Sequence, residues 1–410
     1  MAAPLASLRT ILRVPLLAGT LAVPGLPAQQ APPRPPTLPE LEAQAVRDSH
    51  DATVHYQLAM ADWDRTRWDD AERALQTALQ VAPSYAEAHL ALGVLPERRG
   101  EGYWKRRVRE RGESEVVTEL LRAEQHYRKA FLLNPLVDLR VVGKFEQASG
   151  DFYVMQRGGR LFFWVVPWWN RELVKGMNEF REGKYERAGQ RFAELAANRR
   201  FSGQDVDLPG PILWYQGLTA AHLGNFEQAA RNLAILTGRA VALENDSTAP
   251  PSQIPLGANH YRFLMATLLY LGGRHEQAIP VFRRALEFDL SLYEAHVQMA
   301  RMYDVAGRPE EGLAERRLAL DVNPEDPDLL ADYAGALIRL GRLTDAQAPL
   351  AEAASYNPRD ARVPYLRGLV AESLGQPAEA RAALERFLAL APSRFAGERA
   401  DAQQRLARLP

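Results

Sequence analysis

The residue types that most often perform catalysis or bind metals are spread along this chain without a shared pattern. The eight histidines stand far apart, and none lies in the His-Glu-x-x-His arrangement of zinc hydrolases. The chain has no cysteine, which excludes a thiol nucleophile, disulfides and a lipid-modified cysteine. It also has no Gly-x-Ser-x-Gly elbow and no phosphate-binding glycine-rich loop. We therefore expect a non-enzymatic protein with no catalytic residues, no cofactor and no metal site.

One acidic cluster is the nearest approach to a cation site. It comprises Asp62, Asp64, Asp69 and Asp70. The cluster lacks the glycine and the terminal glutamate of a calcium-binding loop. Carboxylates on a helical protein are far more often solvated than coordinated, so we do not assign a metal to it.

An arginine-rich insertion at residues 96–114 carries Tyr103 and Trp104 at its centre. This composition could form a contact patch for an anionic partner or a lipid headgroup, with Trp104 as an anchor. Glutamates are interleaved with the arginines, however, and such a segment is more often a solvated charged loop. We favour the solvated loop.

A second insertion, within residues 136–168, contains two runs of β-branched and aromatic residues on either side of Gly158 and Gly159. Paired glycines supply the positive φ of a tight turn, so we predict a β-hairpin at 152–166, with a buried helix as the alternative. The densest aromatic cluster of the chain stands at the end of this insertion and comprises Phe162, Phe163, Trp164, Trp168 and Trp169. They could contact a membrane interface or a hydrophobic partner. We favour packing inside the molecule, because so large an exposed aromatic surface promotes aggregation.

Three prolines, Pro324, Pro358 and Pro392, recur at a spacing of 34 residues, and each closes a similar block. Within each block, apolar residues at steps of three and four stand on both sides of a glycine. This pattern predicts two amphipathic helices joined by a tight turn. The glycine can adopt the positive φ that ends the first helix, and the proline ends the second.

These blocks resemble the tetratricopeptide repeat family, whose units have 34 residues with small, aromatic and proline positions in this arrangement. The resemblance extends upstream with decreasing fidelity and gives eight units. It implies an all-α fold, a right-handed superhelical solenoid of antiparallel helix pairs. In this family the first helix of each unit lines a concave groove. Carried onto this sequence, the groove positions are Trp214, Leu218, Phe263, Tyr270, Arg301, Tyr365 and Leu369.

The resulting groove is largely apolar and aromatic, which suits an extended peptide or a partner helix. The alternative is that the superhelix curls tightly and these residues contact other parts of the chain. The formal net charge of -1 gives no support to nucleic-acid binding. Membrane contact is possible but not favoured, and the sequence does not determine the oligomeric state.

The composition of the N-terminal residues indicates export. Residues 1–28 contain no acid and place Arg9 and Arg13 before an apolar stretch, the plan of a signal peptide. We divide the remainder into a proline-rich linker (29–48), N-terminal repeats with the basic insertion (49–135), the aromatic insertion (136–168), the main array (169–392) and a capping helix (393–410). We expect an exported protein of a bacterial envelope, periplasmic or otherwise envelope-associated.

The leading hypothesis is a non-enzymatic scaffold that binds a peptide or a partner protein in its concave groove. A peripheral membrane or envelope-assembly factor that uses the aromatic cluster is the first alternative. A cell-wall glycan-binding module is the second. Because repeat folds serve many functions, the partner cannot be named from the sequence.

Overall fold

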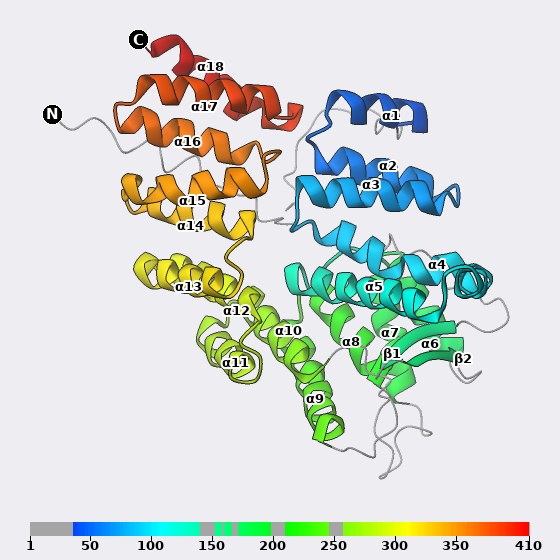
Figure 1. Ribbon diagram of the computed structural model, residues 1–410. Coiled ribbons are helices and arrows are strands. Elements are labelled where there is room, and N and C mark those ends of the chain that lie inside the picture. Colours follow the sequence, from blue (N-terminus) through cyan, green and yellow to red (C-terminus); the bar gives the residue numbers. More distant parts are fainter. Residues whose placement is uncertain are drawn as a thin grey trace, which may run out of the picture.

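The computed structural model describes residues 36–139, 152–157, 160–165, 171–197, 210–245 and 257–409. Within these ranges, successive helix pairs pack antiparallel and stack on one another (Figure 1). The first pair is α2 (Ala52–Trp63) with α3 (Trp68–Val81), and the second is α4 (Ala86–Arg111) with α5 (Glu113–Leu133). The third is α6 (Arg171–Arg181) with α7 (Tyr185–Ala196), and the fourth is α8 (Gly210–His222) with α9 (Phe226–Asn245).

The remaining four pairs lie in the C-terminal half. They are α10 (Ala258–Leu271) with α11 (His275–Phe288), α12 (Tyr293–Val305) with α13 (Pro309–Val322), α14 (Pro327–Arg339) with α15 (Leu343–Tyr356), and α16 (Arg362–Ser373) with α17 (Pro377–Leu390). The predicted solenoid of antiparallel helix pairs is confirmed. In the part of the chain that the structure describes, no helix is long and apolar enough to cross a membrane.

A glycine with positive φ ends the first helix of six of these pairs. Its φ lies between 70° and 79° at Gly183, Gly224, Gly273, Gly307, Gly341 and Gly375. The residue after the glycine donates its backbone N–H back across the turn, as Arg308 does to the Tyr303 carbonyl at 2.8 Å. This bond satisfies a carbonyl that the helix end would otherwise leave without a partner. Thr66, with a φ of 58°, takes the same place in the first pair.

The arginine-rich insertion is helical, which corrects the expectation of a solvated loop. Helix α4 bends at Gly100, where φ is 72°, and continues to Arg111 before Gly112 turns the chain into α5. The two lengthened helices project as a hairpin with a small apolar cluster of its own. Trp104 is only 4% exposed there and donates its indole N–H to the Pro96 carbonyl at 2.9 Å. Trp104 is therefore a packing residue, and its burial argues against the alternative in which it anchors a partner.

Helices also occupy both ends of the described chain. Helix α1 (Leu38–Arg47) packs against α2, so the predicted linker is not extended beyond residue 37. At the other end, α18 (Ala396–Arg408) packs against α17 and forms a cluster with Leu390 and Phe387. The predicted signal peptide lies outside the described residues.

The predicted β-hairpin is confirmed at the level of the backbone. Strands β1 (Phe152–Arg157) and β2 (Arg160–Val165) pair antiparallel, with Arg157 opposite Arg160. This register leaves a connection of two residues, the loop length that paired glycines favour. Strand β1 contacts α4 and α5, so the hairpin lies on the second repeat. Trp168 and Trp169 lie outside the described residues.

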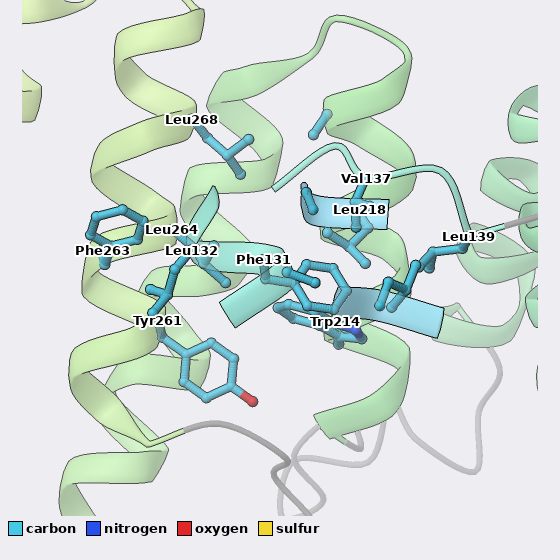
Figure 2. Packing of buried hydrophobic residues seen from close by; sticks show 14 of the residues in the cluster. Phe131, Leu132, Val137, Leu139, Trp214, Leu218, Tyr261, Phe263, Leu264 and Leu268 are labelled. Carbon is cyan, nitrogen blue, oxygen red and sulfur yellow. The ribbon is translucent and has the colours of Figure 1, made fainter. Parts of the chain in front are cut away.

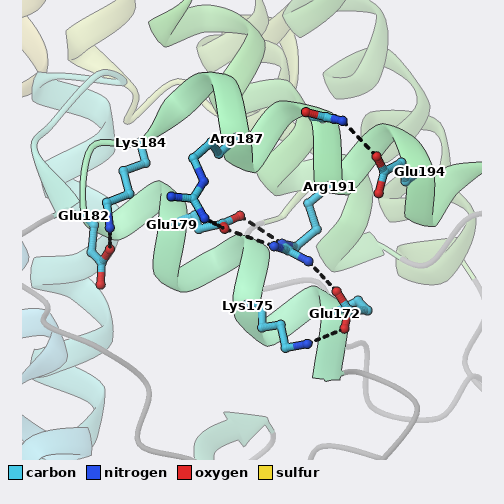
Figure 3. Close-up of polar contacts among 9 residues, drawn as sticks. Glu172, Lys175, Glu179, Glu182, Lys184, Arg187, Arg191 and Glu194 are labelled. Carbon is cyan, nitrogen blue, oxygen red and sulfur yellow. Dashed lines mark hydrogen bonds and ion pairs between the residues drawn. The ribbon is translucent and has the colours of Figure 1, made fainter.

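Ion pairs join the two helices of the third repeat, α6 and α7 (Figure 3). The Arg191 guanidinium of α7 donates from Nε and Nη2 to the two carboxylate oxygens of Glu179, at 2.8 and 3.0 Å. It also bonds Glu172, which Lys175 contacts at 2.6 Å. Bidentate geometry is the favourable arrangement for an arginine–carboxylate pair, so this network fixes the angle of α6 on α7.

Gly93 permits the closest helix approach in the second repeat. A Cβ added there would lie 2.7 Å from the backbone N and Cα of Tyr127 on α5. Because backbone atoms cannot move aside alone, we predict that Gly93→Ala lowers the free energy of unfolding by about 1–3 kcal/mol. Urea unfolding followed by circular dichroism measures the loss.

Gly335→Ala is the matched control. The nearest atom to an added Cβ at Gly335 is Arg339 Nη1 at 3.8 Å, and the site lies within α14. Alanine there should leave stability unchanged or raise it by about 0.4–1 kcal/mol, because it restricts the unfolded chain. Equal effects of the two substitutions would contradict the close approach at Gly93.

Candidate functional site

The concave face of the middle repeats is filled by the chain itself. Figure 2 shows Phe131, Leu132, Val137 and Leu139, from the end of α5 and the segment after it, gathered with residues of α8 and α10. The ring of Phe131 lies 5.4 Å from that of Trp214, and Trp214 lies 5.9 Å from Tyr261, both edge to face. A segment of the same molecule therefore occupies the position that the sequence assigned to a partner.

Five of the predicted groove residues are buried, which corrects the prediction that they line an open groove. Trp214, Leu218, Phe263, Tyr365 and Leu369 each have at most 6% of their surface exposed. Their apolar side chains pack against neighbouring helices of the same chain.

Contacts of Phe263 and Tyr365 illustrate this packing. Phe263 packs on Phe282 of its own repeat with ring centroids 5.4 Å apart. Tyr365 packs on Phe387 at 4.9 Å and donates its hydroxyl to Asp401 of α18 at 2.8 Å. Of the predicted groove residues, only Tyr270 is half-buried and only Arg301 is exposed, so a contact role for these two stays a prediction.

The array returns to its own beginning, and α15–α17 lie beside α1–α3 (Figure 1). Asn357 donates its side-chain N–H to the Val81 carbonyl at 3.2 Å, although the two residues are 276 positions apart. Arg394 pairs with Asp51 at 3.1 Å and donates to the Thr53 hydroxyl at 2.9 Å. We call this contact between the first repeat and the last two repeats the seam. The predicted alternative, a superhelix that curls tightly onto itself, is the one observed.

A second contact joins distant repeats. Lys129 of α5 donates to Glu294 of α12 at 2.6 Å and to the Tyr293 hydroxyl. Tyr293 in turn donates to Asp326 at 3.4 Å. The second repeat is thus tied to the sixth.

A cleft of about 520 Å³ opens within the seam, and we call it the seam cleft. Leu79, Gln80 and Pro83 of the first repeat form one wall. Glu325, Pro327 and the run Tyr356–Arg359 form the other. Three prolines and a tyrosine give flat apolar walls, whereas Gln80, Arg359 and Glu325 add hydrogen-bonding groups of both kinds. This combination is suited to an extended peptide more than to a small molecule.

Two histidines lie directly behind the cleft wall. His89 donates its Nε2–H to the Pro83 carbonyl at 2.9 Å, which leaves its Nδ1 as an acceptor. His126 Nδ1 lies 2.8 Å from that atom and is therefore its donor. Burial lowers the pKa of His89 to about 4, which keeps this ring neutral near pH 7. Neutral His89 thus holds Pro83 in place.

The seam also affects His50. Burial, together with the positive charges of Arg359 and Arg386, lowers the pKa of His50. Both arginines come from the last two repeats, so the shift is a consequence of the array meeting its own start.

Three of the four aspartates in the acidic cluster of the first repeat pair with arginines. Asp62 and Asp70 pair with Arg67 at 3.4 and 2.8 Å, and Asp69 pairs with Arg99 at 2.6 Å. In the described ranges, no group of three or more histidine, aspartate or glutamate side chains is arranged to hold a metal ion.

One row of apolar residues was not recognised from the sequence, although the 34-residue period marks it. Phe288, Val322, Tyr356 and Leu390 occupy the same position at the end of the second helix in the last four repeats. Phe288 and Tyr356 remain 54% and 48% exposed, and Leu390 is covered by α18. Apolar residues at the end of a helix that no neighbour covers could have been read as surface contacts.

An array of stacked helix pairs with exposed loop edges and a proline-lined cleft defines a helical-repeat interaction protein. A family model described as tetratricopeptide repeat matches residues 56–101, 216–291 and 334–395. The chain therefore carries tetratricopeptide repeats over these ranges. Repeats of this family in general bind other proteins or peptides, and their proteins generally act as non-enzymatic scaffolds.

Comparison with individual proteins gives more distant similarities. The chain is 32% identical over 120 residues to the type IV pilus assembly protein PilF of Pseudomonas aeruginosa, an alignment that covers 29% of this chain and 48% of that protein. The chain therefore spans about half the length of that curated relative.

Solved structures of similar fold include the C-terminal part of a TPR repeat-containing protein from Cytophaga hutchinsonii, with a TM-score of 0.45 and 13% identity, covering 57% of this chain and 86% of that chain. A structure of Pseudomonas aeruginosa PilF gives a TM-score of 0.38 at 14% identity over 58% of this chain and 96% of that chain.

The segment that fills the concave face should stabilise the whole molecule. Phe131 is almost fully buried against Trp214, so we predict that Phe131→Ala lowers the free energy of unfolding by about 3–5 kcal/mol. Arg301→Ala, on an exposed side chain, should change it by no more than about 0.5 kcal/mol. Equal and small losses in urea unfolding would show that the concave face is open to solvent.

Acid should destabilise the protein through its buried histidines. The pKa of His89, His222 and His260 is about 4 in the folded protein, lowered mainly by burial, so the unfolded chain binds more protons. The free energy of unfolding is therefore undiminished by these histidines above about pH 6.5, and it decreases as the pH falls from there towards about 4. His89→Gln should lose less stability than the wild type between about pH 7.5 and about pH 5, as urea unfolding measures. An identical pH dependence of the two proteins would contradict a neutral His89.

Proposed function

We propose that this protein is a non-enzymatic scaffold that binds an extended peptide segment of a partner protein in the seam cleft. The concave face of the middle repeats is an unsuitable site because the end of α5 and the segment up to residue 139 fill it. The observation that carries the proposal is a cleft of about 520 Å³ between walls that combine prolines with polar side chains.

The chemistry of the cleft indicates what it would bind. Tyr356 is nearly half exposed, and its ring offers a flat surface for a proline or an aliphatic side chain of the peptide. Gln80 and Arg359 line the cleft, and Arg359 Nη1 donates to Gln80 Oε1 at 3.4 Å. The remaining N–H groups of both side chains can donate to peptide carbonyls. An extended peptide exposes unpaired backbone groups, which such side chains can satisfy.

The compartment is part of the proposal. The composition of residues 1–28 supports export, and we place the protein in the bacterial envelope. The relative named as a pilus assembly protein matches only part of this chain and supports a role in binding other proteins, without indicating a particular assembly. The membrane and glycan alternatives rest on the aromatic cluster, and no contact of the described residues favours either of them over peptide binding.

A photo-cross-linking amino acid at position 356 tests this proposal. In cells that express the full chain, we expect it to form a specific adduct with one partner protein. Tyr356→Ala should weaken the binding of that partner about tenfold, the usual effect of removing an aromatic anchor. Affinity is measured by titration with the purified partner.

Phe288 is the matched control. It occupies the same repeat position, is similarly exposed (54% against 48%) and is not among the residues that line the cleft. A cross-linker at position 288 should give no such adduct, and Phe288→Ala should leave the affinity unchanged. The same adduct at both positions would indicate binding along the whole loop edge and would rule out the seam cleft as the site.

A further inference from the structure

Two charged side chains line the seam cleft without neutralising each other. They are Arg359 and Glu325, and both are exposed. Among the described residues, Arg359 forms no ion pair with a carboxylate, and Glu325 forms none with a basic group. The Arg359 guanidinium instead donates a long hydrogen bond of 3.4 Å to the neutral side chain of Gln80. Both charges are therefore available to a bound chain.

A second arginine adds to the positive charge beside Arg359. Arg386 of α17 donates from Nη2 to the carbonyl of the cleft residue Pro358 at 3.4 Å, and it is paired with no carboxylate in the part of the chain that the structure describes. Burial lowers the pKa of His50, and the charges of Arg359 and Arg386 lower it further. These two guanidinium groups therefore create a positive field at this end of the cleft.

Other arginines near the seam have partners within the protein. Arg362 pairs with two aspartates, and Arg394 pairs with Asp51 at 3.1 Å. Their charges are balanced by the fold itself. In the described ranges, the charges of Arg359 and Arg386 are not balanced in this way.

We propose that the seam cleft selects peptide segments that carry an acidic residue and a basic residue beside a proline or an aliphatic residue. The acidic side chain pairs with Arg359 in the field of Arg386, and the basic side chain pairs with Glu325. The proline or aliphatic residue packs on the half-exposed ring of Tyr356. This inference rests on the proposed function, because it names the class of peptide that the same cleft binds.

The charges determine which peptide binds more than how tightly it binds. A guanidinium and a carboxylate can form two parallel hydrogen bonds, which fixes the position of the acidic residue. Water competes for exposed ion pairs, so one such pair changes the affinity by no more than about fivefold. A peptide with the opposite arrangement of charges is repelled at both positions, and this repulsion excludes wrong partners.

A phage-displayed library of short random peptides, selected on the full chain, supplies the probes. Peptides that bind the wild type and fail to bind Tyr356→Ala are assigned to the cleft. We expect these sequences to be enriched in aspartate or glutamate and in lysine or arginine, each at a constant distance from a proline or an aliphatic residue.

Synthetic copies of these peptides then test the pairing with Arg359. Arg359→Ala should weaken their binding about fivefold, and replacement of the acidic residue in the peptide by its amide should have the same effect. The two changes together should cost no more than either one alone, because they remove the same ion pair. Fluorescence anisotropy measures the four affinities. Arg317→Ala is the matched control, since Arg317 is exposed and is not among the residues that line the cleft.

If Arg359→Ala fails to fold by circular dichroism, the wild type is titrated with the acidic peptide and with its amide analogue. Their affinities should differ about fivefold at low salt and become equal in about 1 M salt, because salt screens the ion pair. Affinities that differ equally at both salt concentrations would contradict the pairing.

The possible results separate this inference from the proposed function. Peptides that depend on Tyr356 but show no enrichment of charged residues would overturn the inference and leave peptide binding in the cleft intact. Independent, additive effects of Arg359→Ala and of the amide replacement would overturn it as well, and so would an equal loss in Arg317→Ala. If no selected peptide depends on Tyr356, both the proposed function and the inference are wrong.

Discussion

A single helix pair cannot bury its own apolar surface, and most of this structure follows from that constraint. Each pair covers one face of its neighbour, so the array needs a covering element at each end. Helix α18 covers Leu390 at one end and α1 packs on α2 at the other. The concave side of the middle repeats carries further apolar surface, and the end of α5 covers it with Phe131. The chain thus satisfies within itself the contacts that an open repeat array offers to a partner.

The sequence was sufficient to predict the helices, the β-hairpin and the pairing of the helices within each repeat. The 34-residue period and the glycines that end the first helices predicted the eight pairs, because local backbone chemistry decides where these helices begin and end. Gly158 and Gly159 predicted the hairpin for the same reason. These features depend on neighbours a few residues away, which the sequence displays directly.

The candidate site could not be predicted in this way. Whether Trp214 is a groove residue or a core residue depends on Phe131, 83 positions earlier in the chain. The period says nothing about how far the superhelix curls, which is the sum of small rotations between repeats. Trp104 illustrates the same limit, because the bend at Gly100 turns a charged stretch into a helix that packs on α5. The burial of these tryptophans depends on contacts between segments that the sequence alone does not bring together, so it was not predicted.

The seam has a consequence for how such a protein can change in evolution. An open array tolerates the gain or loss of a whole unit, since each unit touches only its neighbours. Here Asn357 must meet Val81 and Arg394 must meet Asp51, so the first and last units have to arrive at one place. A duplication or deletion of 34 residues would carry one end past the other by a full unit. The number of repeats in this chain is therefore fixed by geometric closure, as the number of strands is fixed in a closed barrel.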